Sequence, residues 1–164
     1  MSEREALIGR YERGAELILE ALERVPGEAR MWRPEEGRWS VHEVVWHCAD
    51  AELVGASRLR YLLAEPNPIL IAFDQDLWAT VLDYHALPIE TALETLQAVR
   101  RSTVAILRNL PDDAFGREGR HTEVGPMTVL QWLESYAGHL EDHARQIERN
   151  LEAWNKGPEM VASA

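Results

Sequence analysis

Residues 128–155, TVLQWLESYAGHLEDHARQIERNLEAWN, carry the longest amphipathic pattern in the chain. Thr128 and Gln131 have the spacing of a helix capping box, and Gly157-Pro158 is expected to end the helix. With about 3.6 residues per turn, the apolar side chains collect on one arc and the charged ones on the opposite side. The apolar arc holds Val129, Tyr136, Leu140, Ile147 and Trp154. The pattern predicts a helix roughly 40 Å long that buries one face.

Three further segments share this helical period, at residues 2–25, 40–64 and 88–110. The first two begin with capping boxes, Ser2 with Glu5 and Ser40 with Glu43. We expect a short helix from Asp74, a short extended piece at 121–124, and almost no other strand. Four long amphipathic helices predict an all-α four-helix bundle with long connecting loops. One domain is expected over residues 1–158, with a disordered tail at 159–164.

The chain has 164 residues and a net charge of −11, which disfavours nucleic-acid binding. Arg100 and Arg101 share their segment with Glu90 and Glu94, so we interpret all four as a solvated helix face. Cys48 is the single cysteine, and it is expected to pack in the core. No apolar run has the length of a signal peptide or a membrane span, so we expect a soluble, cytoplasmic protein with no membrane partner.

Two histidines stand out, because His139 and His143 lie four residues apart and fall on the inward edge of their helix. They are either two hydrogen-bonded core residues or two ligands of a metal site. His47 borders the apolar arc of segment 40–64 and is a candidate third ligand, whereas His42 points about 140° away and is expected to be exposed. Three neutral imidazoles suit Zn, Ni, Fe or Cu and leave coordination positions open. The pattern HExxH is absent, which disfavours a zincin peptidase.

Two motifs resemble those of the DinB-like superfamily. They are W-S-x-x-E-x-x-x-H-x-x-D, ending at Asp50, and H-x-x-x-H-x-x-Q-I, beginning at His139. The resemblance covers nearly the whole chain and implies a four-helix bundle with a three-histidine metal site. It implies His47, His139 and His143 as ligands of one divalent ion, with waters completing the shell. Zinc or nickel is favoured.

Several polar residues are candidates for supporting roles. Glu43 and Asp50 lie one turn before and after His47, and either is placed to orient a ligating imidazole from behind. Glu43 has the competing interpretation of a helix cap. Gln146 follows His143 by three residues and is placed to bind a metal-bound water or a backbone group. His85 and His121 lie in connecting segments, as proton shuttles or as exposed loop residues.

The resemblance implies two kinds of chemistry on a small-molecule substrate. One is metal-dependent hydrolysis, and the other is transfer or isomerisation with a low-molecular-weight thiol such as bacillithiol or mycothiol. A metal-bound water or thiol would be the nucleophile in each case. The alternatives are a non-catalytic metal-binding or stress-response protein, and a helical dimerisation module without metal. A homodimer is expected, with Gly9 and Gly14 allowing close approach of the first helix.

Overall fold

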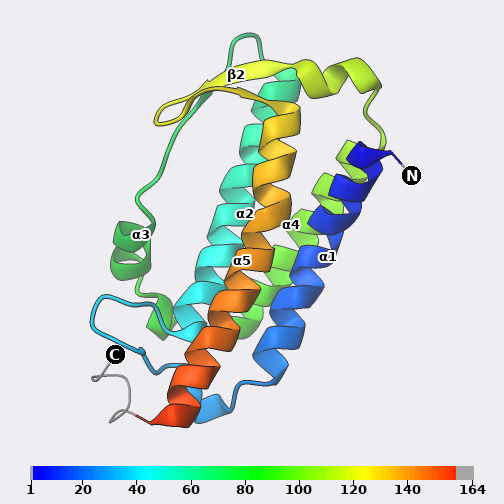
Figure 1. Cartoon of the computed structure of the whole chain (residues 1–164). Helices are drawn as coiled ribbons and strands as arrows, with labels where there is room; N and C mark the ends of the chain where they lie inside the picture. Colours follow the sequence, from blue (N-terminus) through cyan, green and yellow to red (C-terminus); the bar gives the residue numbers. More distant parts are fainter. Residues whose placement is uncertain (1, 158–164) are drawn as a thin grey trace.

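Four long helices make up the body of the computed structural model, which describes residues 2–157 (Figure 1). They are α1 (Glu3–Glu23), α2 (Val41–Ala64), α4 (Ile89–Arg108) and α5 (Val129–Lys156). All four begin and end within a few residues of their predicted bounds. The predicted four-helix bundle is therefore confirmed. The tail predicted at 159–164 lies outside the described residues.

The helix starts follow the sequence signals closely. Capping boxes are present at Ser2, Ser40 and Thr128, where each hydroxyl accepts from the backbone three residues on. The short helix α3 (Gln75–Val81) begins after Asp74, whose carboxylate accepts from the nitrogen of Leu77 at 2.9 Å. These local hydrogen bonds satisfy backbone donors that the first helical turn leaves free. The helix starts can therefore be predicted from the sequence.

The order of the helices around the bundle is α1, α5, α2, α4, so α1 and α2 lie diagonally opposite (Figure 1). α1 runs parallel to α5, because Arg10 pairs with Glu141 and Arg24 pairs with Glu148 further along both helices. α2 runs antiparallel to α5 in the adjacent position. This topology places the two histidine-bearing helices side by side, although His47 and His139 lie 92 residues apart along the chain.

A small sheet closes one end of the bundle and was not predicted. It pairs β1 (Ile69–Leu70) in parallel with β2 (Glu118–His121), and β2 in antiparallel with β3 (Gly125–Thr128). Strands of two to four residues give too short an alternation to be recognised in a sequence. The extended piece predicted at 121–124 is wrong after its first residue, since 122–124 form the hairpin turn.

Short 3-10 turns complete the connections: η1 (Gly27–Ala29), η2 (Tyr84–Ala86) and η3 (Asp112–Gly116). The prediction that His42 is exposed is wrong, because the segment around η2 packs against this side chain and buries it. Its Nε2 lies 2.9 Å from the carbonyl oxygen of Tyr84 and 3.0 Å from that of Leu87. The segment around η2 therefore covers a second face of α2. Cys48 is fully buried in the core, as predicted.

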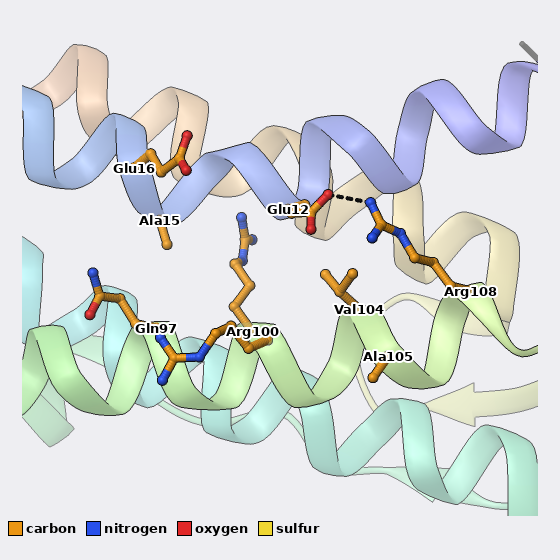
Figure 2. A pocket seen from close by; sticks show the side chains of 9 residues that line it. Glu12, Ala15, Glu16, Gln97, Arg100, Val104, Ala105 and Arg108 are labelled. Atoms are coloured by element: carbon orange, nitrogen blue, oxygen red, sulfur yellow. Dashed lines mark hydrogen bonds and ion pairs between the residues drawn. The ribbon is translucent and has the colours of Figure 1, made fainter.

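Arg100 is buried and contradicts the predicted solvated face. Its Nε donates to Glu52 at 3.0 Å, and both side chains are almost completely shielded from solvent. Glu52 also accepts from the hydroxyl of Tyr11, and the guanidinium lies over that ring, 4.0 Å from its centroid. Figure 2 shows Arg100 reaching from α4 towards α1, beside the ion pair of Glu12 with Arg108. Buried charges are tolerated when they are paired and hydrogen-bonded, as here.

Gly14 serves this packing within the chain. A Cβ at residue 14 would lie 2.0 Å from Nη1 of Arg100 and 3.0 Å from Cβ of Leu140. The sequence suggested that Gly14 allows a second subunit to approach closely. In the structure, α4 and α5 of the same chain occupy this position instead. Gly9 has no neighbour within 4 Å of such a Cβ among the described residues. Across residues 2–157, no helix combines the length and apolar character needed to cross a membrane.

Candidate metal centre

Three imidazoles converge where α2 and α5 pack against each other. Nε2 of His139 lies 3.3 Å from Nε2 of His47 and 3.1 Å from Nε2 of His143. One nitrogen from each of the three rings lies within 4.8 Å of the others, and no other such group occurs among the described residues. The i, i+4 spacing on α5 brings two of these nitrogens together, and the antiparallel packing of α2 supplies the third.

Burial keeps all three imidazoles neutral. Removal from water is the largest cause that lowers the pKa of His47, to about 2, and of His139, to about 3. The neighbouring imidazole of His143 adds to both shifts. The pKa of His143 is also lowered by burial, although the hydrogen bond that His143 donates to Gln146 acts in the opposite direction. A metal-ligating histidine must be neutral, so burial prepares the three rings for coordination.

Gln146 fixes the orientation of one ring. Its Oε1 lies 2.8 Å from Nδ1 of His143 and can only accept, so the proton of that neutral ring sits on Nδ1. The lone pair of Nε2 is thereby turned towards the other imidazoles. The sequence placed Gln146 near a metal-bound water or a backbone group. In the structure it instead has the role that was predicted for Glu43 and Asp50.

Two of the three separations between the clustered nitrogens fit a single cation. Two nitrogens that are each about 2.1 Å from one ion lie roughly 3.0 to 3.4 Å apart at right-angle to tetrahedral geometry. The two observed separations are 3.3 and 3.1 Å. Protons alone satisfy the cluster poorly, because the neutral His139 carries one N–H and its Nε2 faces two other nitrogens. Nδ1 of His47 and of His139 have no hydrogen-bond partner among the described residues.

Aromatic rings shield the cluster on the α2 side. The ring of Trp39 lies 4.7 Å from that of His47, centroid to centroid, and Phe73 stacks on the same imidazole at 6.5 Å. On the α5 side, Tyr136 lies 6.0 Å from His139. These contacts remove part of the His47 and His139 rings from water, and this desolvation lowers the pKa of both imidazoles.

A cavity of about 210 Å³ opens beside the cluster, between α2, the segment at 73–75, the β2–β3 hairpin and α5. Its lining residues are His47, Ala51, Arg58, Phe73, Gln75, His121, Val124, Met127, Ser135, Tyr136 and His139. Two of the three clustered imidazoles thus face an accessible space. The arrangement joins a nitrogen donor set to a pocket of the size of a small organic molecule.

A sequence model of the DinB superfamily matches residues 10–147, which include the histidine cluster, all of α2 and most of α5. The chain belongs to the DinB superfamily. The predicted membership is therefore confirmed.

Relatives within the superfamily carry the name "putative metal-dependent hydrolase". One from Geobacillus kaustophilus is 33% identical over 125 residues, which are 73% of this chain and 68% of that protein. Another, from Oceanobacillus iheyensis, is 32% identical over 111 residues, which are 68% of this chain and 64% of that protein. The chain thus spans about two-thirds of the length of these relatives.

Two solved structures share the fold. YfiT from Bacillus subtilis, described as "a probable metal-dependent hydrolase with an unusual four-helix bundle topology", superposes with a TM-score of 0.86. It is 23% identical, and the alignment covers 94% of this chain and 90% of that one. The four-helix bundle protein TT2238 has a TM-score of 0.61 at 20% identity, covering 89% of this chain and 98% of that one. These likenesses extend over nearly the whole of the DinB-type bundle.

Glu43 and Asp50 lie near His47 in sequence but bond elsewhere. Glu43 accepts from the backbone of Ser40 at 2.8 Å and from Nε of Arg33 at 3.0 Å. Burial alone raises the pKa of Glu43, but these hydrogen bonds bring it below its ordinary value. Among the described residues, neither carboxylate is hydrogen-bonded to the three imidazoles. Glu43 acts as the cap of α2 that the competing interpretation predicted.

Asp50 accepts from the hydroxyl of Tyr84 at 2.6 Å, which joins α2 to η2. Burial raises the pKa of Asp50, and the Tyr84 bond opposes that shift. Asp50 therefore holds the covering segment in place, and it is not among the residues that line the cavity.

His85 and His121 differ in their relation to the centre. His85 is only partly buried and pairs with Oγ of Ser40 at 2.8 Å, away from the cavity. His121 ends β2, is buried, and lines the cavity with two of the clustered histidines. Its Nδ1 accepts from the backbone nitrogens of Glu123 and Val124 at 3.2 and 3.4 Å. The neutral ring consequently carries its proton on Nε2.

Proposed function

We propose that the chain is a metal-dependent hydrolase that acts on a small molecule, with one divalent ion held by Nε2 of His47, His139 and His143. The observation that carries the proposal is the convergence of three neutral imidazoles, one buried and two partly buried, beside an accessible cavity. Nε2 of His139 lies 3.3 Å from that of His47 and 3.1 Å from that of His143. The names of the DinB relatives support the same class of reaction.

Zinc or nickel suits this donor set, because imidazole is a borderline ligand that both ions accept. An ion bound by three protein ligands keeps open positions, and it supplies Lewis acidity and lowers the pKa of a bound water towards neutrality. The donor set contains no carboxylate or thiolate, so a bound ion would keep its full double charge. This favours polarisation of a substrate carbonyl or phosphoryl oxygen.

The chain's own residues supply orientation and proton control. Gln146 holds the imidazole of His143 through Nδ1, and Trp39 and Phe73 keep water from the back of His47. In the cavity, Nε2–H of His121 is a donor for an oxygen of the substrate or of the leaving group. Its Nδ1 is held by two backbone donors, so the proton is presented in a fixed direction.

The cavity also limits the size of the substrate. The cavity volume is about 210 Å³. This is below the usual range for drug-sized ligands. A short ester or amide fits such a space. Thiol transfer remains a prediction of the sequence resemblance, because no residue of the cavity favours a thiol over an oxygen nucleophile.

The test is turnover of a panel of small esters and amides by the zinc- and nickel-loaded protein. We expect hydrolysis in the native protein, loss of it after chelation, and recovery when the metal is restored. His143→Ala should abolish turnover, while His85→Ala, which removes a histidine outside the cavity, should retain it. Bound metal without turnover on any substrate would favour the non-catalytic metal-binding alternative instead.

A further inference from the structure

Arg58 gives the cavity beside the metal centre an unusual charge. It is the single formally charged side chain among the eleven described residues that line this space, and none of the eleven is a carboxylate. The chain as a whole carries 28 acidic against 17 basic residues. A lining that excludes every acidic side chain in so acidic a protein presents a local positive potential to a substrate.

The guanidinium of Arg58 has hydrogen-bond donors without a partner among the described residues. Its Nη1 donates to the hydroxyl of Tyr136 at 3.2 Å, and its Nη2 donates to the carbonyl of Ile71. A guanidinium carries five N–H groups, so these two bonds leave three unused. One of the three is Nε, which is buried and has no partner among the described residues. A buried donor without a partner is costly, and an anionic ligand would satisfy it.

The two bonds that Arg58 does make hold it in place over the cavity. Tyr136 belongs to α5, and Ile71 to the segment that leads to Phe73, so the guanidinium is tethered on two sides. A side chain that is already ordered loses less entropy when it binds a ligand. The hydroxyl of Tyr136, Nε2 of His121 and the side chains of Gln75 and Ser135 surround the same space as neutral polar groups.

We propose that Arg58 binds a carboxylate group of the substrate, which makes the substrate a small ester or amide that carries one negative charge. The planar fork of a guanidinium matches the two oxygens of a carboxylate. A single guanidinium among neutral donors balances one negative charge, whereas a phosphate dianion would bring a second charge into the cavity. This inference rests on the proposed function for the reaction itself, but the binding of the carboxylate is independent of turnover.

The test compares butyrate with butyramide, which have the same size and shape and differ in charge. Each is titrated into the full-length ¹⁵N-labelled protein, as purified and after chelation, at matched ionic strength. The Nε–H resonance of Arg58 reports contact directly. The variants are Arg58→Gln and Arg58→Lys. Arg60→Gln is the matched control, since it makes the same charge change two residues further along α2. Arg60 is exposed and donates to the carbonyl of Ala56 and the hydroxyl of Ser102.

We expect butyrate to bind the native protein roughly 10- to 100-fold more tightly than butyramide and to shift the Nε–H resonance, because a charge-assisted bidentate contact is lost with the amide. Arg58→Gln should abolish the preference, Arg58→Lys should restore part of it, and Arg60→Gln should keep it whole. Circular dichroism of each variant separates loss of binding from loss of fold.

Three results would overturn the inference. They are equal binding of the two probes to the native protein, a preference that survives in Arg58→Gln, and tighter binding of inorganic phosphate than of butyrate. If the preference for butyrate over butyramide disappears on chelation, the carboxylate binds the metal and the inference about Arg58 is also overturned. If the metal-loaded protein hydrolyses no ester or amide but butyrate still binds at Arg58, the proposed function fails while the carboxylate site stands.

Discussion

Replacement of Arg100 by methionine tests the buried network that ties α1, α2, α4 and α5 together. Methionine keeps much of the aliphatic stem but removes the hydrogen bonds to Glu52 at 3.0 Å, to the carbonyl of Tyr136 at 2.9 Å and to the carbonyl of Tyr11. The two carbonyls keep their ordinary bonds within the helices, so they lose little. The main cost is a buried Glu52 left without its cation.

Breaking a buried ion pair by removing one partner costs about 3–5 kcal/mol. For a chain of this size each kcal/mol lowers the melting temperature by roughly 2–4 °C, so Arg100→Met should melt about 6–20 °C below the native protein. Arg101→Met is the matched control, because Arg101 is exposed and its loss should stay within about 0.5 kcal/mol. Urea unfolding followed by circular dichroism measures both.

The same variant has a characteristic pH dependence. Burial raises the pKa of Glu52, while Arg100 lowers it. Without the guanidinium, the folded-state pKa of Glu52 rises further above its unfolded value. The folded variant then binds more protons than the unfolded chain, so its stability falls as the pH rises. Arg100→Met should therefore lose more stability relative to the native protein at pH 8 than at pH 5. A loss below about 1 kcal/mol, or one equal to that of Arg101→Met, would refute the buried network.

Three other perturbations probe the site and its packing. The metal-free protein should lose stability as the pH falls below about 6.5. The unfolded histidines take up protons in this range, whereas the pKa of folded His47 is about 2. In an acid titration, the variant with alanine at all three ligand positions should not show this loss of stability. Gln146→Leu should weaken metal binding about 10- to 100-fold, because the imidazole of His143 loses its orienting acceptor; unchanged affinity in a competitive chelator assay would contradict this. Gly14→Ala should destabilise the protein, because the new Cβ would clash with the buried guanidinium of Arg100. Gly9→Ala has no such neighbour, so it should raise the free energy of unfolding by about 0.5–1 kcal/mol, measured by thermal melts.

The long helices were predictable because their signals are local. Capping boxes and the helical period depend on residues within one or two turns, and each was read correctly at Ser2, Ser40 and Thr128. The period also placed His139 and His143 on an inward edge. The approach of His47 to that pair depends on the order of the helices around the bundle, which spacing along the chain does not encode.

The two errors have different origins, and the one at His42 comes from the assumption that a helix buries one face only. α2 is covered on a second side by η2, so His42 is buried although it points away from the core arc. Arg100 continues the buried stripe of α4 that runs through Leu96, Val104 and Leu107, a signal that was present in the sequence. A charged residue on such a stripe requires a buried partner, and that partner comes from a different helix.

Gln146 was predicted to lie near the centre, but its hydrogen bond to His143 was not predicted. A side chain three residues after a histidine lies on the same face of a helix, within reach of its ring nitrogen. The spacing from His143 was therefore sufficient to predict the hydrogen bond to Nδ1. Arg58 gave no comparable signal, because it enters the cavity only when the segment at 71–73 and the β2–β3 hairpin pack beside α2.

The most direct test of the metal centre is the metal content of the protein. Untagged native protein, purified without chelator, is compared by elemental mass spectrometry with the variant that carries His47→Ala, His139→Ala and His143→Ala. About one equivalent of a divalent ion in the native protein and none in the variant is the predicted result. If neither protein contains metal, even after incubation with zinc and nickel, the proposed metal centre is wrong. The three histidines are then hydrogen-bonded core residues.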